Sequence, residues 1–99
     1  MYKLLIIDDE EPIRQAIQML GDWQALGIDA FFEASNGMKG LEIMRQETPD
    51  IVLVDMKMPI VSGVDFLKTA CFDFPNVKYI IISGYDDFNI NSTKQLGQL

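Results

Sequence analysis

A carboxylate stands at the end of a short apolar segment in the middle of this sequence. Residues 51–54 are all apolar and mostly β-branched, and Asp55 follows them directly. Pro49 and Asp50 punctuate the start of the run, which is typical of a strand. A strand that is apolar on both faces suits the centre of a parallel sheet, where ligand chemistry gathers at the carboxyl ends of the strands. Asp55 is therefore the first candidate for a reactive group.

Two further apolar runs end in side chains that carry oxygen. The acidic pair Asp8 and Asp9 follows the run at residues 3–7, and Ser83 follows the run at residues 77–82. If the three runs form neighbouring parallel strands, all of these side chains converge on one edge of the sheet. Carboxylates held close together repel one another and raise each other's pKa unless a cation lies between them. Magnesium is the natural cation for such an all-oxygen site.

The sequence around these runs predicts that strands and helices alternate. We expect a strand at residues 3–7, a helix from Pro12 to Gly27, a strand at 28–34, a helix opened by Asn36-Gly37, a strand at 50–54, a helix between Ser62 and Pro75, and a strand at 77–82. In the first helix, apolar residues recur on one face at Ile13, Ala16, Ile17 and Leu20. Alternation of this kind implies right-handed crossovers and a parallel sheet.

Composition limits the kinds of protein that the chain can be. Ninety-nine residues, of which 48% are hydrophobic and 23% charged, predict one small globular domain. The net charge of −7 argues against a nucleic-acid surface. The lack of a signal sequence and of a membrane-length apolar run predicts a cytoplasmic location. Because Cys71 is the single cysteine and there is no histidine, an internal disulfide and histidine-based catalysis are excluded.

Taken together, the motifs resemble the receiver domain of two-component response regulators. The matching residues are Asp8-Asp9, Asp55 with Met56-Lys57-Met58-Pro59, Gly63, and Ile82-Ser83-Gly84-Tyr85. The resemblance implies a flavodoxin-like, three-layer α/β fold with a parallel sheet in strand order 2-1-3-4. The segments 22–28, 33–37 and 83–88 are similar to receivers that precede AraC-type DNA-binding domains, although these 99 residues hold no such domain.

The resemblance implies a role for each candidate residue. Asp55 corresponds to the aspartate that accepts a phosphoryl group from a sensor histidine kinase. Asp9 is implied to bind Mg2+ directly and Asp8 to bind it through water, with further oxygens from Asp55 and from the Lys57 backbone carbonyl. Ser83 corresponds to the hydroxyl residue that hydrogen-bonds the phosphoryl group and changes position on phosphorylation.

Simpler roles remain open for the same residues. Asp55 taken alone is typical of a solvent-exposed acid at a strand end, and Ser83 is typical of a turn residue. The acids at residues 8–11 also favour the positive N-terminus of the following helix, and Glu10 and Glu11 suit that role best. The Lys57 side chain reads as a solvated surface lysine.

The sequence departs from the receiver pattern towards its end. We expect residues 1–88 to form an incomplete receiver domain and residues 89–99 to form a divergent tail. The family's fifth strand, with its lysine before a proline, and its fifth helix have no counterpart, and Lys94 is not followed by proline. The strand at 77–82 would then be an exposed apolar edge, a template for pairing with another chain. Self-association through that edge, or through the C-terminal segment, is expected.

Three functional hypotheses follow. The first is a phosphoacceptor receiver, a signalling module rather than an enzyme, which would regulate transcription through a DNA-binding domain outside this sequence. Its cofactor would be Mg2+ and its partner a sensor histidine kinase, with no direct contact to nucleic acid or membrane. The second is a receiver-like interaction module that no longer switches. The third, a magnesium-dependent phosphohydrolase, normally needs a second acid two residues after the nucleophile, where Lys57 stands.

Overall fold

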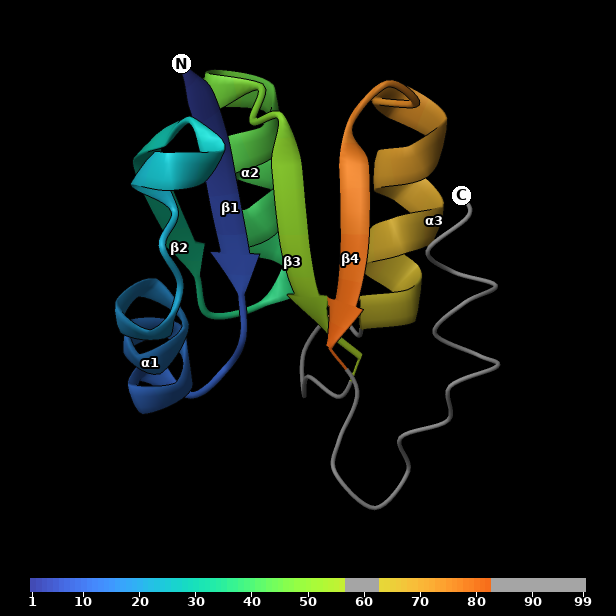
Figure 1. The fold of residues 1–99 in the computed structure, drawn as a ribbon. Helices are drawn as coiled ribbons and strands as arrows, with labels where there is room; N and C mark the ends of the chain where they lie inside the picture. Colours follow the sequence, from blue (N-terminus) through green and yellow to red (C-terminus); the bar gives the residue numbers. More distant parts are fainter. Residues whose placement is uncertain (57–62, 83–99) are drawn as a thin grey trace.

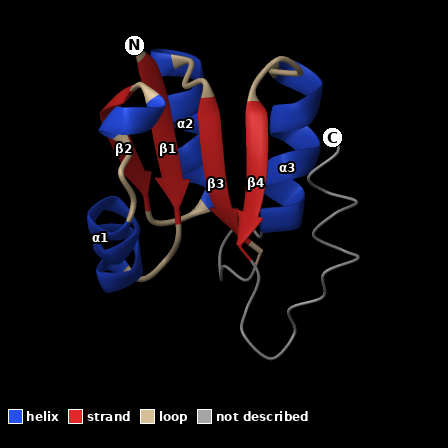
Figure 2. Ribbon diagram, in the orientation of Figure 1, coloured by secondary structure: helices blue, strands red, loops and turns tan. Residues whose placement is uncertain are grey.

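Strands and helices alternate along the chain, as the sequence predicts (Figure 2). The computed structural model describes residues 1–56 and 63–82. Its elements are β1 (Tyr2–Ile7), α1 (Glu11–Leu20), the 3-10 turn η1 (Gln24–Leu26), β2 (Ile28–Ala34), α2 (Gly37–Glu47), β3 (Ile51–Asp55), α3 (Gly63–Asp73) and β4 (Lys78–Ile82). The predictions made for Lys57, for Ser62 and for Ser83 and everything after it lie outside the described residues.

The four strands form one parallel sheet in the order β2-β1-β3-β4, which confirms the predicted order. Ile7 of β1 stands opposite Val54 of β3, and Asp55 of β3 stands opposite Ile82 of β4. Figure 1 shows the arrowheads of these three strands pointing to the same end of the molecule, near which α1 lies. The register therefore brings the three predicted strand ends to one edge of the sheet.

Both faces of the sheet are apolar, and β1 is the most deeply buried strand. Residues 4–7 of β1 have no exposed surface. The face covered by α2 and α3 holds the larger core cluster, made of Leu5, Ile7, Ala34, Met44, Val52, Val54, Phe66, Leu67, Ala70, Tyr79 and Ile81. The opposite face holds Leu4, Ile6, Ile28 and Leu53, with Ile17 and Trp23 packed against them.

A glycine lets α2 lie close to the sheet. A side chain at Gly40 would place its Cβ atom 2.5 Å from Cδ1 of Ile7 and 3.1 Å from Cε1 of Phe66. Glycine costs a helix roughly 1 kcal/mol relative to alanine. In α2 the contacts with β1 and α3 that the missing side chain allows offset this loss of helix stability.

The first helix is shorter than the sequence predicts. We expected it to continue to Gly27, but it ends at Leu20 because Gly21 is extended, with φ −99° and ψ 152°. The Trp23 ring lies where a Cβ atom of Gly21 would stand, and its indole N–H donates to the Ile17 carbonyl at 2.9 Å. Trp23 thus satisfies a carbonyl near the end of the helix and starts the turn that leads to β2.

The predicted apolar face of α1 is also only partly correct. Ile17 is half-buried against the sheet, whereas Ile13, Ala16 and Leu20 are exposed. No residue of α1 is fully buried. Within residues 1–56 and 63–82, moreover, no helix combines the length and the apolar character needed to cross a membrane.

Two phenylalanines of α3, Phe66 near its start and Phe72 near its end, give a matched test of the core. Phe66 is 0% exposed and Phe72 is 86% exposed. We expect Phe66→Ala to lower the free energy of unfolding by about 3–5 kcal/mol, because it leaves a cavity. Phe72→Ala should change it by only about 0.5 kcal/mol or less. Urea unfolding measures both, and equal effects of the two substitutions would contradict the burial described here.

Candidate functional site

The carboxyl edge of the sheet brings Asp8 and Asp55 side by side. Since Ile7 stands opposite Val54, the next residues of β1 and β3 are these two acids. The backbone on either side continues the hydrogen-bonding pattern of the sheet. The Asp8 N–H donates to the Ala34 carbonyl at 3.1 Å, and the Met56 N–H donates to the Ile82 carbonyl at 3.2 Å. The positions of both acids are therefore set by the sheet.

Three acids in sequence form a compact cluster at the end of β1. One carboxylate oxygen from each of Asp8, Asp9 and Glu10 lies within 4.8 Å of the other two. The Glu10 N–H donates to Oδ1 of Asp8 at 2.9 Å, which turns the chain back on itself before α1 begins. Asp8 is only 4% exposed, whereas Asp9 and Glu10 face solvent.

The environment of Asp8 raises its pKa from 3.8 to about 6. Burial is the main cause, because the charged carboxylate loses water. The hydrogen bond from the Glu10 N–H lowers the pKa, and the negative charges of Asp55, Asp9 and Glu10 raise it. The cluster therefore concentrates negative charge that a bound cation would neutralise.

The donor set suits a hard divalent cation. Mg2+ prefers oxygen ligands and usually keeps several waters while binding one or two carboxylates. The predicted ligands Asp8 and Asp9 lie together, and Asp55 lies next to Asp8. Lys57 and Ser83 lie outside the described residues. The sequence favoured Glu10 as a helix residue only, but Glu10 also brings a carboxylate oxygen to the cluster. Its position next to Asp9 was the sequence feature that could have indicated this.

Gly63 presses the start of α3 against the backbone of Asp55. A Cβ atom at Gly63 would lie 2.3 Å from the Asp55 carbonyl oxygen and 2.6 Å from the Met56 Cα. The Gly63 N–H also donates to the Met56 carbonyl at 3.3 Å. Only a residue without a side chain fits this contact, which explains a glycine at the position that the motif singled out.

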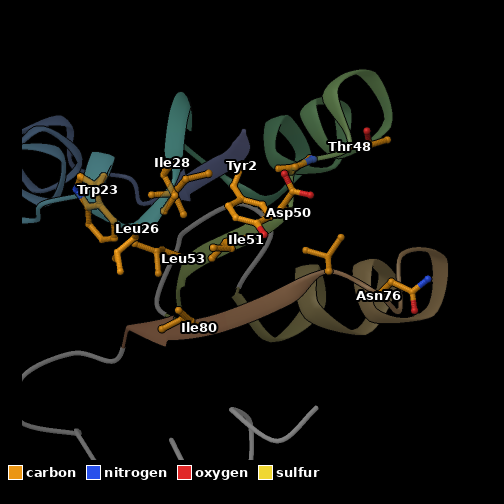
Figure 3. A pocket seen from close by; sticks show the side chains of 13 residues that line it. Tyr2, Trp23, Leu26, Ile28, Thr48, Asp50, Ile51, Leu53, Asn76 and Ile80 are labelled. Atoms are coloured by element: carbon orange, nitrogen blue, oxygen red, sulfur yellow. The ribbon is translucent and has the colours of Figure 1, made fainter.

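A separate cavity of about 650 Å³ lies over the face of the sheet opposite α2 and α3, towards the end where the strands begin. Its lining is mainly apolar, and Figure 3 shows Ile51, Leu53 and Ile80 among its side chains, with Asp50 and Asn76 as polar neighbours. None of the clustered acids lines this cavity. It is therefore distinct from the acidic site.

Comparison with known proteins agrees with this geometry. The family model of the response regulator receiver domain matches residues 4–98. The chain is 34% identical over 88 residues to YesN of Bacillus subtilis, an uncharacterized transcriptional regulatory protein. That match covers 89% of this chain and 24% of YesN. The chain thus spans about a quarter to a third of the length of the curated relatives it matches.

Solved structures give the same result. The receiver domain of AraT from Geobacillus stearothermophilus is 35% identical, with a TM-score of 0.85 over 96% of this chain and 74% of that one. The two-component transcriptional regulator AraC from Clostridium phytofermentans shares the fold at 24% identity, with a TM-score of 0.82 over 99% and 93% of the two chains. TrrA from Thermotoga maritima, solved in complex with Mg2+ and BeF, shares it at 24% identity, with a TM-score of 0.79 over 98% and 82%.

The raised pKa of Asp8 predicts that the free energy of unfolding of the metal-free protein depends on pH. Because its folded-state pKa lies above 3.8, Asp8 leaves stability intact below about pH 3.8 and lowers it as the pH rises to about 6. We expect Asp8→Asn to be more stable than the wild type by about 3 kcal/mol at pH 7.5, and by almost nothing near pH 3.5. Urea unfolding in a chelator, from pH 3.5 to 8, measures the difference.

An Asp73→Asn variant provides the control. Asp73 is an exposed carboxylate at the end of α3, away from the cluster. Its replacement removes one carboxylate outside the cluster, so the Asp73→Asn profile is the reference with which the Asp8→Asn profile is compared. If the stability of Asp8→Asn changes with pH in parallel with that of the wild type, the charge of Asp8 does not destabilise the folded protein.

Proposed function

The chain belongs to the response regulator receiver family, and from this premise we propose that it accepts a phosphoryl group from a sensor histidine kinase onto Asp55, with Mg2+ as cofactor. One observation carries the proposal: the sheet register places Asp55 beside the buried carboxylate of Asp8, next to the acidic cluster. A receiver domain of a two-component response regulator is a signalling module rather than a classical enzyme. The kinase partner is inferred from the family.

The proposed reaction is a direct transfer from phosphohistidine. A carboxylate oxygen of Asp55 attacks the phosphorus in line with the bond to the histidine nitrogen. The new O–P bond forms as the N–P bond breaks, and the imidazole leaves with the electron pair and takes up a proton. The protein contributes position and charge neutralisation more than covalent chemistry.

The acidic residues would hold the metal close to Asp55. When bound, Mg2+ neutralises the oxygens of the transferring phosphoryl group. We assign direct ligation to Asp9 and ligation through water to Asp8, with oxygens from Asp55 and from the Lys57 carbonyl. The structure of TrrA, which shares this fold and was solved with Mg2+ and BeF, supports Mg2+ as the cofactor. Glu10 is a further source of a carboxylate oxygen.

The rest of the signalling role belongs to the same proposal. Ser83 would hydrogen-bond the phosphoryl group and carry the switch. Control of transcription would pass through a DNA-binding domain, as the much greater length of the relatives suggests. The net charge of −7 makes direct binding of nucleic acid by this domain unfavourable. The family resemblance and the single cysteine support a cytoplasmic location.

Phosphorylation by acetyl phosphate tests the proposal directly. We expect intact-mass measurement to detect one added phosphoryl group in the wild type with Mg2+, and none in Asp55→Asn or in excess chelator. Asp9→Asn should lower the rate at limiting Mg2+, since it removes the proposed direct ligand. The proposal fails if folded wild-type protein gains no phosphoryl group, or if Asp55→Asn gains it equally.

A second role, self-association, is favoured by the edge of the sheet. Among the described residues β4 pairs only with β3, so its other edge faces no described strand. Ile80 of β4 is 41% exposed and adjoins the apolar cavity. An apolar edge strand readily pairs with another chain. We propose that two copies associate along β4, which would also serve a receiver-like module that does not switch.

Two isoleucines of nearly equal exposure allow a matched test of this association. Ile80 is 41% exposed on β4, and Ile13 is 40% exposed on α1. We expect light scattering at micromolar concentration to give a mass above one chain, which Ile80→Lys returns to one chain and Ile13→Lys leaves unchanged. A mass of one chain for the wild type at every concentration would rule out the association.

A further inference from the structure

We infer that Arg14 is a positioning residue that holds the acidic loop at residues 8–10 in the geometry that binds Mg2+, with Glu33 as its anchor. The inference rests on the proposed function, because it concerns the same metal site. Arg14 lies in the first turns of α1, and its side chain is 12% exposed. It is thus held between the helix, the loop and the sheet.

The contacts of Arg14 join the loop to a strand. Its Nη1 donates to the backbone carbonyl of Asp8 at 2.6 Å, and its Nε donates to Oε1 of Glu33 at 2.8 Å. Gln18, one turn later on α1, donates to the other carboxylate oxygen of Glu33 at 3.0 Å. Glu33 therefore accepts from two side chains of α1.

The carbonyl that Arg14 holds belongs to the peptide bond between Asp8 and Asp9. A peptide unit is planar, so fixing its carbonyl also fixes the N–H of Asp9 and the direction in which the chain leaves Asp8. The Asp8 N–H and one Asp8 carboxylate oxygen are already held, by Ala34 and by Glu10 respectively. Arg14 adds a third hydrogen bond, to the peptide group that joins the two proposed ligands.

Glu33 is a firm anchor because it belongs to the sheet. It lies on β2 opposite Ile6 of β1, one residue before the end of the strand pair. Helix α1, by contrast, has no fully buried residue. The polar contacts of Arg14 and Gln18 with Glu33 consequently tie α1, and the loop that precedes it, to the sheet.

The charge of Arg14 has the opposite effect on cation binding. A guanidinium close to the loop repels Mg2+, so charge alone predicts that removing it tightens binding. Positioning predicts the reverse, because a loosened loop must be ordered when the metal binds. The two explanations therefore differ in sign, which makes the inference testable.

Calorimetric titration of the full chain with Mg2+ distinguishes them. Lysine keeps the charge but lacks the planar fork that reaches two acceptors, and methionine removes both. We expect Arg14→Lys and Arg14→Met each to raise the Kd for Mg2+ about tenfold, a typical loss when an outer-shell partner of a metal ligand is removed. Lys3→Met, which removes a cation that bonds Glu47 at the far end of β1, should leave Kd unchanged.

Wild-type affinity in Arg14→Lys would overturn the inference, and so would an equal loss in Lys3→Met. Tighter binding by Arg14→Met would show that the side chain acts through its charge alone. If the wild type itself binds no Mg2+, the proposed cofactor fails, which is a different result from equal binding by wild type and variants.

Amide hydrogen exchange tests the positioning role without metal. In Arg14→Lys and in Glu33→Gln, we expect the Glu10 amide, which bonds Asp8, to exchange at least several-fold faster than in the wild type. The Asp8 amide, which bonds Ala34 in the sheet, should keep its rate and so report that the fold is intact. Unchanged exchange at Glu10 in both variants would overturn the inference.

Discussion

The carboxylates at one edge of the sheet repel one another, and the structure around them must limit this repulsion. Asp8 is nearly buried there, with Asp55, Asp9 and Glu10 as charged neighbours, and its pKa rises to about 6 as a result. The first turn of α1, whose N-terminus is positive, and the guanidinium of Arg14 both lie next to these charges. They offset the repulsion only in part, so a divalent cation at the proposed site would neutralise the negative charge that remains.

The apolar strands hold this arrangement in place. Residues 4–7 of β1 have no exposed surface, so the point at which the chain emerges at Asp8 is fixed by packing on both faces. Gly40 and Gly63 act in the same way from the helices, since each allows contacts that a side chain would block. The stability of the core is therefore also what sets the geometry of the acids.

The two ends of the sheet have different characters. Acids gather where the strands finish, whereas the cavity where they begin is mostly apolar. Ile80 places part of that apolar surface on β4, at the edge of the described sheet. The proposed phosphoryl chemistry and the proposed association of two chains thus occupy different parts of the same small domain, so each can be altered by substitution without the other.

The sequence alone determined the positions of the four strands, because runs of β-branched residues and the acids that follow them are local signals. The order of the strands followed from the resemblance to receiver domains. The prediction for α1 was wrong in the length of the helix and in part of its buried face. The length depends on a contact between Trp23 and the Ile17 carbonyl, and the exposure depends on where the helix meets the sheet. Glu10 and Arg14 gained their significance only in three dimensions. Their positions follow from a turn at Asp8 and from a glutamate 19 residues after Arg14, and no periodicity in the sequence encodes such contacts.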